Sequence, residues 1–137
     1  MTTHDRTPSS FRKTYPADME TPLYAVYQNQ LECAVDNMTA ADLERMLDVY
    51  KGDVIIWVAL EVVIAAGAAM TVDLGDGNDL DGYADGVNIN VTAGTRTVYP
   101  CGVQYSADDT IDMTVNHTNA VGTIEVSAMA VQVPYIV

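Results

Sequence analysis

The clearest pattern in the chain is a series of short runs in which apolar and polar residues alternate. The run from Thr110 to Asn116 alternates without exception and places Ile111, Met113 and Val115 on one face. Such alternation is typical of a β-strand with one buried face, because successive side chains of a strand point to opposite sides. The other predicted strands are Leu23 to Gln28, Leu31 to Val35, Val54 to Ile64, Met70 to Leu74, Val87 to Val91, Thr95 to Tyr99 and Thr123 to Val133.

Turn signals separate these runs. Lys51-Gly-Asp53 precedes the longest run, and Asn119-Ala-Val-Gly122 indicates a hairpin between the last two. One segment, Thr39 to Leu47, begins with capping-type residues and predicts a turn or two of helix. Eight or nine short strands joined by turns predict an all-β fold, an antiparallel β-sandwich, and the strand number favours a jelly roll. We expect residues 21–137 to form this domain.

Residues 1–20 have a different character from the rest of the chain. They are polar, contain Pro8 and Pro16 and show no periodicity, which predicts an extended N-terminal arm. Arg6, Arg12 and Lys13 are half of the 6 basic residues. An arm whose charge differs from that of its domain indicates contact with another molecule. The alternative is an ordinary disordered terminus.

The densest group of turn residues lies between Asp73 and Gly86. Its side chains include possible oxygen ligands for Ca²⁺, at Asp76, Asn78, Asp79, Asp81 and Asp85. The spacing does not fit an EF-hand, because the first ligand position, counted back from Gly82, falls on Gly77. We therefore interpret the segment as a solvated connection between two half-buried strands and predict no metal site. A non-standard calcium loop at residues 76–85 stays open as an alternative.

Two predicted strands are apolar on both faces. In the run from Val54 to Ile64, one set would face the core: Val54, Ile56, Val58, Leu60 and Val62. The outer face of a lone sandwich is normally polar, so a second apolar face predicts burial against another subunit or against the arm. Cover by a loop of the same chain is the alternative. The residues predicted for self-association are Ile55, Trp57, Val63, Met129 and Val131.

Charge restricts the classes of partner. With 6 basic and 19 acidic residues, the chain has a formal net charge of −13. This charge repels nucleic-acid phosphates and anionic membrane surfaces, so we expect neither nucleic acid nor membrane as a partner. The apolar stretch from Val54 to Met70 is short for a spanning helix and rich in β-branched residues. A strand followed by a corner of small residues explains this stretch better.

The sequence offers little catalytic chemistry. The two histidines are His4, in the arm, and His117, beside a predicted turn. The sequence contains no Gly-x-Ser-x-Gly motif and indicates no Ser-His-Asp set or Cys-His pair. Cys33 and Cys101 lack metal-type spacing, and we expect two buried free thiols rather than a disulfide. We therefore predict a protein that is not an enzyme and holds no cofactor.

Several strings resemble those of small structural proteins of tailed bacteriophages. They are Lys51-Gly-Asp-Val with the apolar run that follows, Ala65-Ala-Gly-Ala, Val72-Asp-Leu-Gly-Asp-Gly, Asp81-Gly-Tyr-Ala-Asp-Gly-Val, Tyr105-Ser-Ala-Asp-Asp-Thr-Ile-Asp-Met-Thr-Val and Gly122-Thr-Ile-Glu-Val. The chain is most similar to the jelly-roll decoration, or cement, proteins on the capsid exterior, which are often trimers. The resemblance covers about residues 45 to 133.

This resemblance implies a virion structural protein that binds the major capsid protein on the capsid exterior, self-associates as a homotrimer and bridges capsomers. From the composition of the arm, we expect Phe11, Arg12, Lys13 and Tyr15 to contact the capsid or sister subunits. An alternative is a receptor- or glycan-recognition module of a phage head or tail fibre, which would use the acidic segment and Tyr83. A cellular carbohydrate-binding domain is a third possibility.

Overall fold

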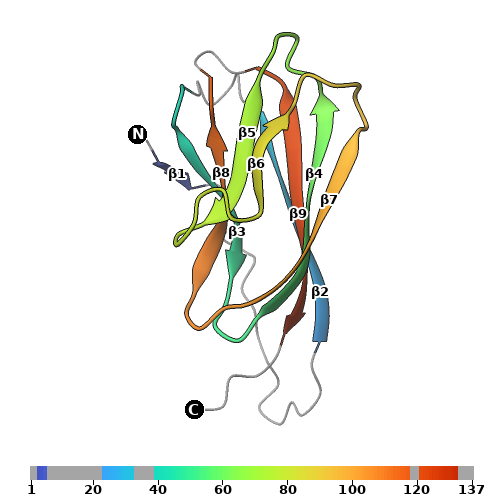
Figure 1. Ribbon diagram of the computed structural model, residues 1–137. Helices are drawn as coiled ribbons and strands as arrows, with labels where there is room; N and C mark the ends of the chain where they lie inside the picture. Colours follow the sequence, from blue (N-terminus) through green and yellow to red (C-terminus); the bar gives the residue numbers. More distant parts are fainter. Residues whose placement is uncertain (1–2, 6–22, 33–38, 118–120, 133–137) are drawn as a thin grey trace.

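The computed structural model describes residues 3–5, 23–32, 39–117 and 121–132, which form strands and, within these ranges, no helix (Figure 1). The strands are β1 (Thr3–Asp5), β2 (Leu23–Glu32), β3 (Leu43–Val49), β4 (Val54–Ile64), β5 (Thr71–Asp76), β6 (Ala84–Asn88), β7 (Arg96–Gln104), β8 (Asp109–Val115) and β9 (Thr123–Gln132). Among these described residues no helix is long and apolar enough to cross a membrane. The predicted all-β fold is confirmed.

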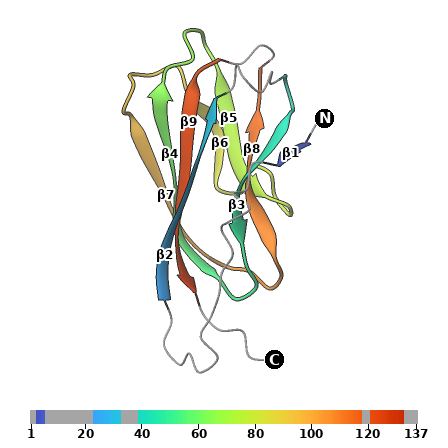
Figure 2. The ribbon, with the colours of Figure 1, turned by 180° about the vertical axis from the view of Figure 1, so that it is seen from behind.

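The strands make two sheets that pack face to face, as the front and back views show (Figures 1 and 2). One sheet has the order β1-β3-β8-β5-β6 and the other the order β2-β9-β4-β7. Between β2 and β9, every connection except the β5–β6 hairpin passes from one sheet to the other, which is the strand order of a jelly roll. The predicted β8–β9 hairpin is wrong, because these strands belong to different sheets and the turn at Gly122 carries the chain across.

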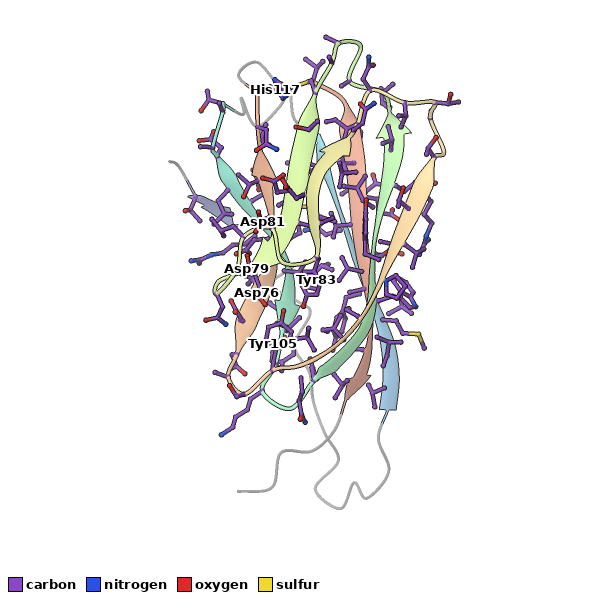
Figure 3. All side chains as sticks on the ribbon, viewed as in Figure 1. Asp76, Asp79, Asp81, Tyr83, Tyr105 and His117 are labelled. Atoms are coloured by element: carbon purple, nitrogen blue, oxygen red, sulfur yellow. The ribbon has the colours of Figure 1, made fainter. Side chains whose placement is uncertain are left out.

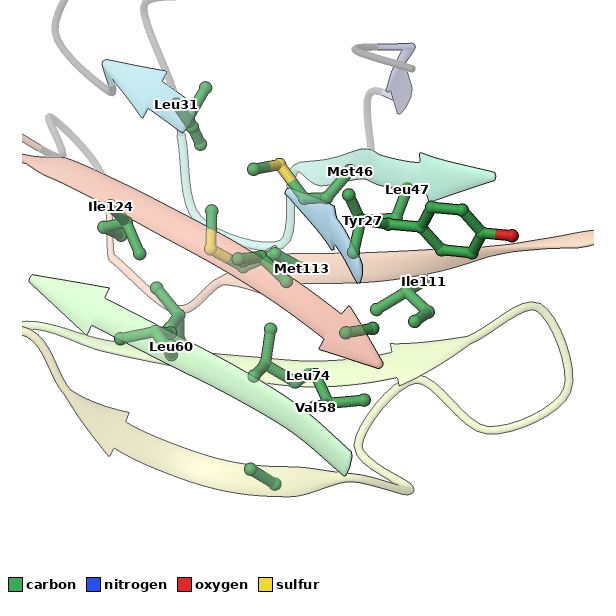
Figure 4. Packing of buried hydrophobic residues seen from close by; sticks show 14 of the residues in the cluster. Tyr27, Leu31, Met46, Leu47, Val58, Leu60, Leu74, Ile111, Met113 and Ile124 are labelled. Atoms are coloured by element: carbon green, nitrogen blue, oxygen red, sulfur yellow. The ribbon is translucent and has the colours of Figure 1, made fainter. Parts of the chain in front are cut away.

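The core lies between the two sheets (Figure 4). The predicted apolar face of β8 is confirmed, since Ile111, Met113 and Val115 are fully buried. Residues from β4, β5 and β9 meet this face from the neighbouring strand and the opposite sheet: Val58, Leu60, Val62, Val72, Leu74, Ile124, Val126 and Ala128. Burial of each large side chain contributes about 1.5–3 kcal/mol, so this layer supplies much of the driving force for folding.

The segment predicted as a short helix is a turn followed by strand β3. The backbone amide of Asp42 donates to the Thr39 carbonyl (3.0 Å), and the Thr39 amide donates to the Asp42 carboxylate (2.9 Å). β3 then pairs antiparallel with β8, and the register shifts between Arg45 and Leu47. That bulge places both Met46 and Leu47 in the buried set. It breaks the two-residue period, which is why the sequence pattern did not indicate a strand here.

A second bulge changes which residues of β4 face the core. The pairing of β4 with both neighbours shifts between Ile55 and Trp57. Ile55 is consequently 0% exposed and belongs to the core, whereas Ile56 is 36% exposed. The prediction that placed Ile55 beside Trp57 on the outer face is therefore wrong, because one extra residue reverses the alternation.

Part of the predicted arm is a strand. β1 pairs in parallel with the edge of β3, with Thr3 opposite Leu43 and Asp5 opposite Arg45. The four residues predicted to contact the capsid, Phe11, Arg12, Lys13 and Tyr15, lie outside the described residues, as does Cys33. Cys101 is a free, half-buried cysteine whose thiol donates to the Ile55 carbonyl (3.3 Å).

Candidate interaction surfaces

The outer face of the β2-β9-β4-β7 sheet carries an apolar row across all four strands. Val26, Met129, Trp57 and Pro100 are successive cross-strand neighbours in this row. Val26 is 54% exposed, and Val98, in the adjacent row, is 47% exposed. We call these five residues the outer-face patch. An apolar group of this kind on a sheet face is typical of a surface that contacts another protein.

Polar residues border the outer-face patch. The next polar row runs across the four strands: Gln30 lies opposite Glu125, Glu125 opposite Glu61, and Glu61 opposite Arg96. The Gln30 amide donates to the Glu125 carboxylate (2.9 Å). The guanidinium of Arg96 lies 5.3 Å from the centroid of the Trp57 ring and donates to the Ser127 hydroxyl (3.4 Å). An apolar centre with a polar rim is the usual anatomy of a protein interface.

The residues predicted for self-association are only partly brought together. Trp57 on β4 lies opposite Met129 on β9, and Val131 is the next residue of β9 on the same outer face. Ile55, in contrast, is in the core. Val63 is half-buried at a register shift between Val62 and Ile64. Sequence reasoning missed Val26, Val98 and Pro100, because only the register of four strands distant in sequence places them beside Trp57. Self-association itself stays a prediction.

The acidic connection between β5 and β6 folds back over its own strand. The Asp76 carboxylate accepts from the backbone amides of Asn78 (2.9 Å) and Asp79 (3.0 Å) through one oxygen. Its other oxygen accepts from the Tyr105 hydroxyl (2.8 Å), which lies 2.5 Å from the Tyr83 hydroxyl (Figure 3). Burial raises the pKa of Tyr83 to about 12 and raises that of Tyr105 as well. Both hydroxyls therefore stay protonated donors, with Tyr83 donating to Tyr105 and Tyr105 to Asp76.

These bonds give the acidic connection a structural role. Asp73 adds to it by accepting from the Gly86 amide (2.8 Å) and from the Asn116 side chain (3.0 Å). Within the described ranges, no group of three or more His, Cys, Asp or Glu side chains is arranged to hold a metal ion. Tyr83, which the recognition alternative would use as a contact, has a half-buried ring that packs against the core, so it does not stand free at the tip of the connection.

Asp112 is a buried carboxylate on β8, in the same sheet as the acidic connection. It is 2% exposed, lies opposite Arg45 and Gly75 in register, and accepts from the Thr110 hydroxyl (2.6 Å). Burial raises its pKa to about 6, and the charges of Asp109 and Asp76 add to this shift, while the Thr110 hydrogen bond and Arg45 oppose it. Folding therefore disfavours the ionised form relative to an unfolded aspartate, and at neutral pH the fold bears the cost of holding this buried charge.

We expect Asp112→Asn to stabilise the fold at about pH 7 by about 1–2 kcal/mol. The folded pKa lies above that of an unfolded aspartate, so the folded chain binds this proton more tightly. The contribution of Asp112 to the free energy of unfolding consequently falls as the pH rises from about 4 to about 6. Urea denaturation at several pH values should show the advantage of the variant over wild type growing across this window. An advantage that is absent or independent of pH would contradict the prediction, and Asp85→Asn, on an exposed residue, is the control.

Comparison with known proteins identifies similarity of fold. No protein-family model matches the chain, and no curated protein matches it significantly. A chain from the cyanophage Pam1 capsid asymmetric unit superposes with a TM-score of 0.66 at 13% identity, over 92% of this chain and 96% of that one. A chain from the acidic stable capsid structure of Helicobacter pylori bacteriophage KHP30 superposes with a TM-score of 0.65 at 11% identity, over 85% of this chain and 93% of that one. A chain from the capsid of Ralstonia phage GP4 superposes with a TM-score of 0.64 at 14% identity, over 96% of this chain and 99% of that one.

Proposed function

We propose that this chain is a capsid decoration protein, a non-enzymatic virion component that binds the outer surface of a phage head and stabilises it by bridging capsomers. The observation that carries this proposal is the shared fold with chains of three phage capsid structures. The superpositions cover 96%, 93% and 99% of those chains, so each of them is a single domain of similar length. Neighbours that each consist of one such sandwich support the role of an added capsid component.

Self-association is the second part of the proposal. The outer-face patch would bury its apolar side chains between copies, most simply in a homotrimer. Such burial contributes about 25 cal/mol for each Å² of apolar surface removed from water. The formal charge of −13 on every copy opposes close approach. Simultaneous contacts with the capsid and with sister copies would compensate by raising the effective concentration of each contact.

The N-terminal arm is the third part. The arm lacks the acidic excess of the domain, and this difference in charge supports a contact between its basic residues and the major capsid protein, while residues 3–5 pair with the sandwich's own strand β3. Phe11 and Tyr15 would add apolar contact area to the charges of Arg12 and Lys13. On this proposal the arm tethers the protein and the sandwich forms the layer above the shell.

Removal of residues 1–20 is expected to abolish binding to heads assembled without this protein, while the sandwich stays folded. Because this deletion also removes β1, the variant with alanine at Phe11, Arg12, Lys13 and Tyr15 is the matched form that keeps that strand. Co-sedimentation with heads measures occupancy, and a thermal melt reports folding. Unchanged occupancy by the alanine variant would refute the arm contact, whereas absence of wild-type binding would refute the decoration function.

The copy number in the particle distinguishes this function from receptor or glycan recognition. Many copies distributed over the head favour decoration, and a few copies at the tail favour recognition. The recognition function depended on Tyr83 as an exposed contact, but the hydroxyl of this residue is bonded to that of Tyr105. Decoration therefore agrees better with the geometry of the acidic connection.

A further inference from the structure

One end of the sandwich has no charged residues in three of its connections. The β4–β5 and β6–β7 connections lie at this end, where β8 also ends and β9 begins (Figure 1). Three segments at this end, namely residues 62–72, residues 86–95 and the described residues of 113–124, contain none of the 19 acidic and 6 basic residues. We call these three segments the uncharged end. His117 lies here, whereas Asp76, Asp79 and Asp81 lie further along the molecule (Figure 3).

A fourth connection, from β2 to β3, reaches the same end and is described from residue 39 onward. In its described part, residues 39–42, the charged residue is Asp42. The Asp42 side chain is 4% exposed, and its carboxylate accepts a hydrogen bond from the Thr39 amide (2.9 Å). Among the described residues, this connection therefore presents little charge to solvent.

Hydrogen bonds from backbone amides join two segments of the uncharged end, residues 62–72 and 86–95. The Ala66 amide donates to the Ile89 carbonyl (3.2 Å), and the Ile89 amide donates to the Met70 carbonyl (3.0 Å). The Gly67 amide donates to the Asn90 side chain (3.0 Å). Ala66, Met70 and Ile89 are also buried in the core below. A surface fixed in this way loses little conformational entropy when a partner binds.

The exposed part of the uncharged end is partly apolar. Ile64 is 59% exposed and Val121 is 42% exposed, and the small residues Ala68 and Ala69, which follow the turn at Gly67, are also exposed. Removal of a carboxylate from water is costly unless it is paired, so the core of a protein interface is depleted of charge. In a chain with a formal charge of −13, the described residues of these three segments offer a surface that desolvates without burying a charge.

We propose that the uncharged end docks on the outer protein surface of the capsid shell, with the strands pointing away from the shell. This inference rests on the decoration function proposed above. The outer-face patch lies on a sheet face that runs alongside the strands, so association through it places copies side by side. In the proposed homotrimer, with its symmetry axis along the strands, the uncharged ends of all copies would point in one direction and form a continuous surface, which suits a broad partner such as the shell rather than a second copy met end to end. The acidic bodies stay in solvent.

The variants Ile64→Glu and Ala68→Glu test this orientation by adding one carboxylate to the uncharged end. Each is expected to weaken binding to heads assembled without this protein by at least tenfold, because the charge would be desolvated at the contact. The melting temperature and the sedimentation coefficient in the absence of heads should stay unchanged. Leu80→Glu, on a 39% exposed residue of the acidic connection, is the matched control and should bind as wild type does.

The outcomes separate the two proposals. If wild-type protein does not bind heads, the decoration function fails. If wild-type protein binds and both variants bind equally well, decoration stands and docking through the uncharged end is overturned. If both variants lose self-association in the absence of heads, the uncharged end is a contact between copies of this chain. That result would also overturn docking of this end on the shell. Because Ile64 borders the core, the Ala68 variant keeps the test valid if Ile64→Glu lowers the melting temperature.

Discussion

Replacement of Gly75 by alanine is expected to lower the free energy of unfolding by about 3 kcal/mol or more. A β-carbon at this position would overlap the backbone carbonyl groups of Asp79 and Leu80, which lie across β5. Backbone atoms cannot move aside as a flexible side chain does. The connection would have to leave its place and lose the bond from the Asp76 amide to the Asp79 carbonyl (2.9 Å).

Urea denaturation of Gly75→Ala measures this effect, and Gly102→Ala is its control. Gly102 is also in a strand, but a β-carbon there would meet no atom within 4 Å. We expect this control to differ from wild type by less than about 1 kcal/mol. Equal stability of the two variants would show that the acidic connection does not pack against β5 as described.

The double variant Val26→Glu/Val98→Glu is expected to convert a self-associated protein to monomer. Both side chains belong to the outer-face patch and are about half exposed in the isolated chain, so the fold should tolerate the change. In an assembly both carboxylates would be removed from water. Arg96 lies close enough to pair with the one at position 98, but the apolar neighbours Met129, Trp57 and Pro100 leave the one at position 26 without a partner. We expect the dissociation constant to rise at least a hundredfold, or about 3 kcal/mol.

Sedimentation velocity over a range of protein concentrations measures this change. Leu80→Glu again serves as the control, since it adds an acidic residue outside the patch. A double variant that keeps the oligomeric state of wild type would remove the outer-face patch from the proposed assembly. A wild-type protein that is monomeric without heads would restrict self-association to the capsid surface.

Much of the fold follows from the two-residue period of the sequence. β4 has its predicted limits, and the predicted face of β8 is buried, because each strand packs one side against the opposite sheet. The errors at Ile55 and at the segment from Thr39 to Leu47 both occur at bulges. An extra residue in one strand reverses all following faces, and local sequence alone does not reveal it.

The candidate surfaces were less predictable than the fold. Trp57 and Met129 could be found because their strands are apolar on both faces. Val26 and Val98 lie in strands whose patterns look ordinary, and only the four-strand register brings them together. The half-buried position of Tyr83 was not evident, because its partner, Tyr105, is 22 residues away in sequence. Contacts of this range depend on topology rather than on local pattern.

The position of Pro100 affects how a crowded layer of these molecules can grow. β7 is an edge strand, and Pro100, in its middle, has no N–H group to donate to an incoming strand. At the opposite sheet, β1 covers the edge of β3. Backbone pairing between the edge strands of neighbouring molecules, which would turn a dense coat into fibrils, is thus disfavoured at both places. Assembly is directed instead to side-chain contacts, which can close into rings.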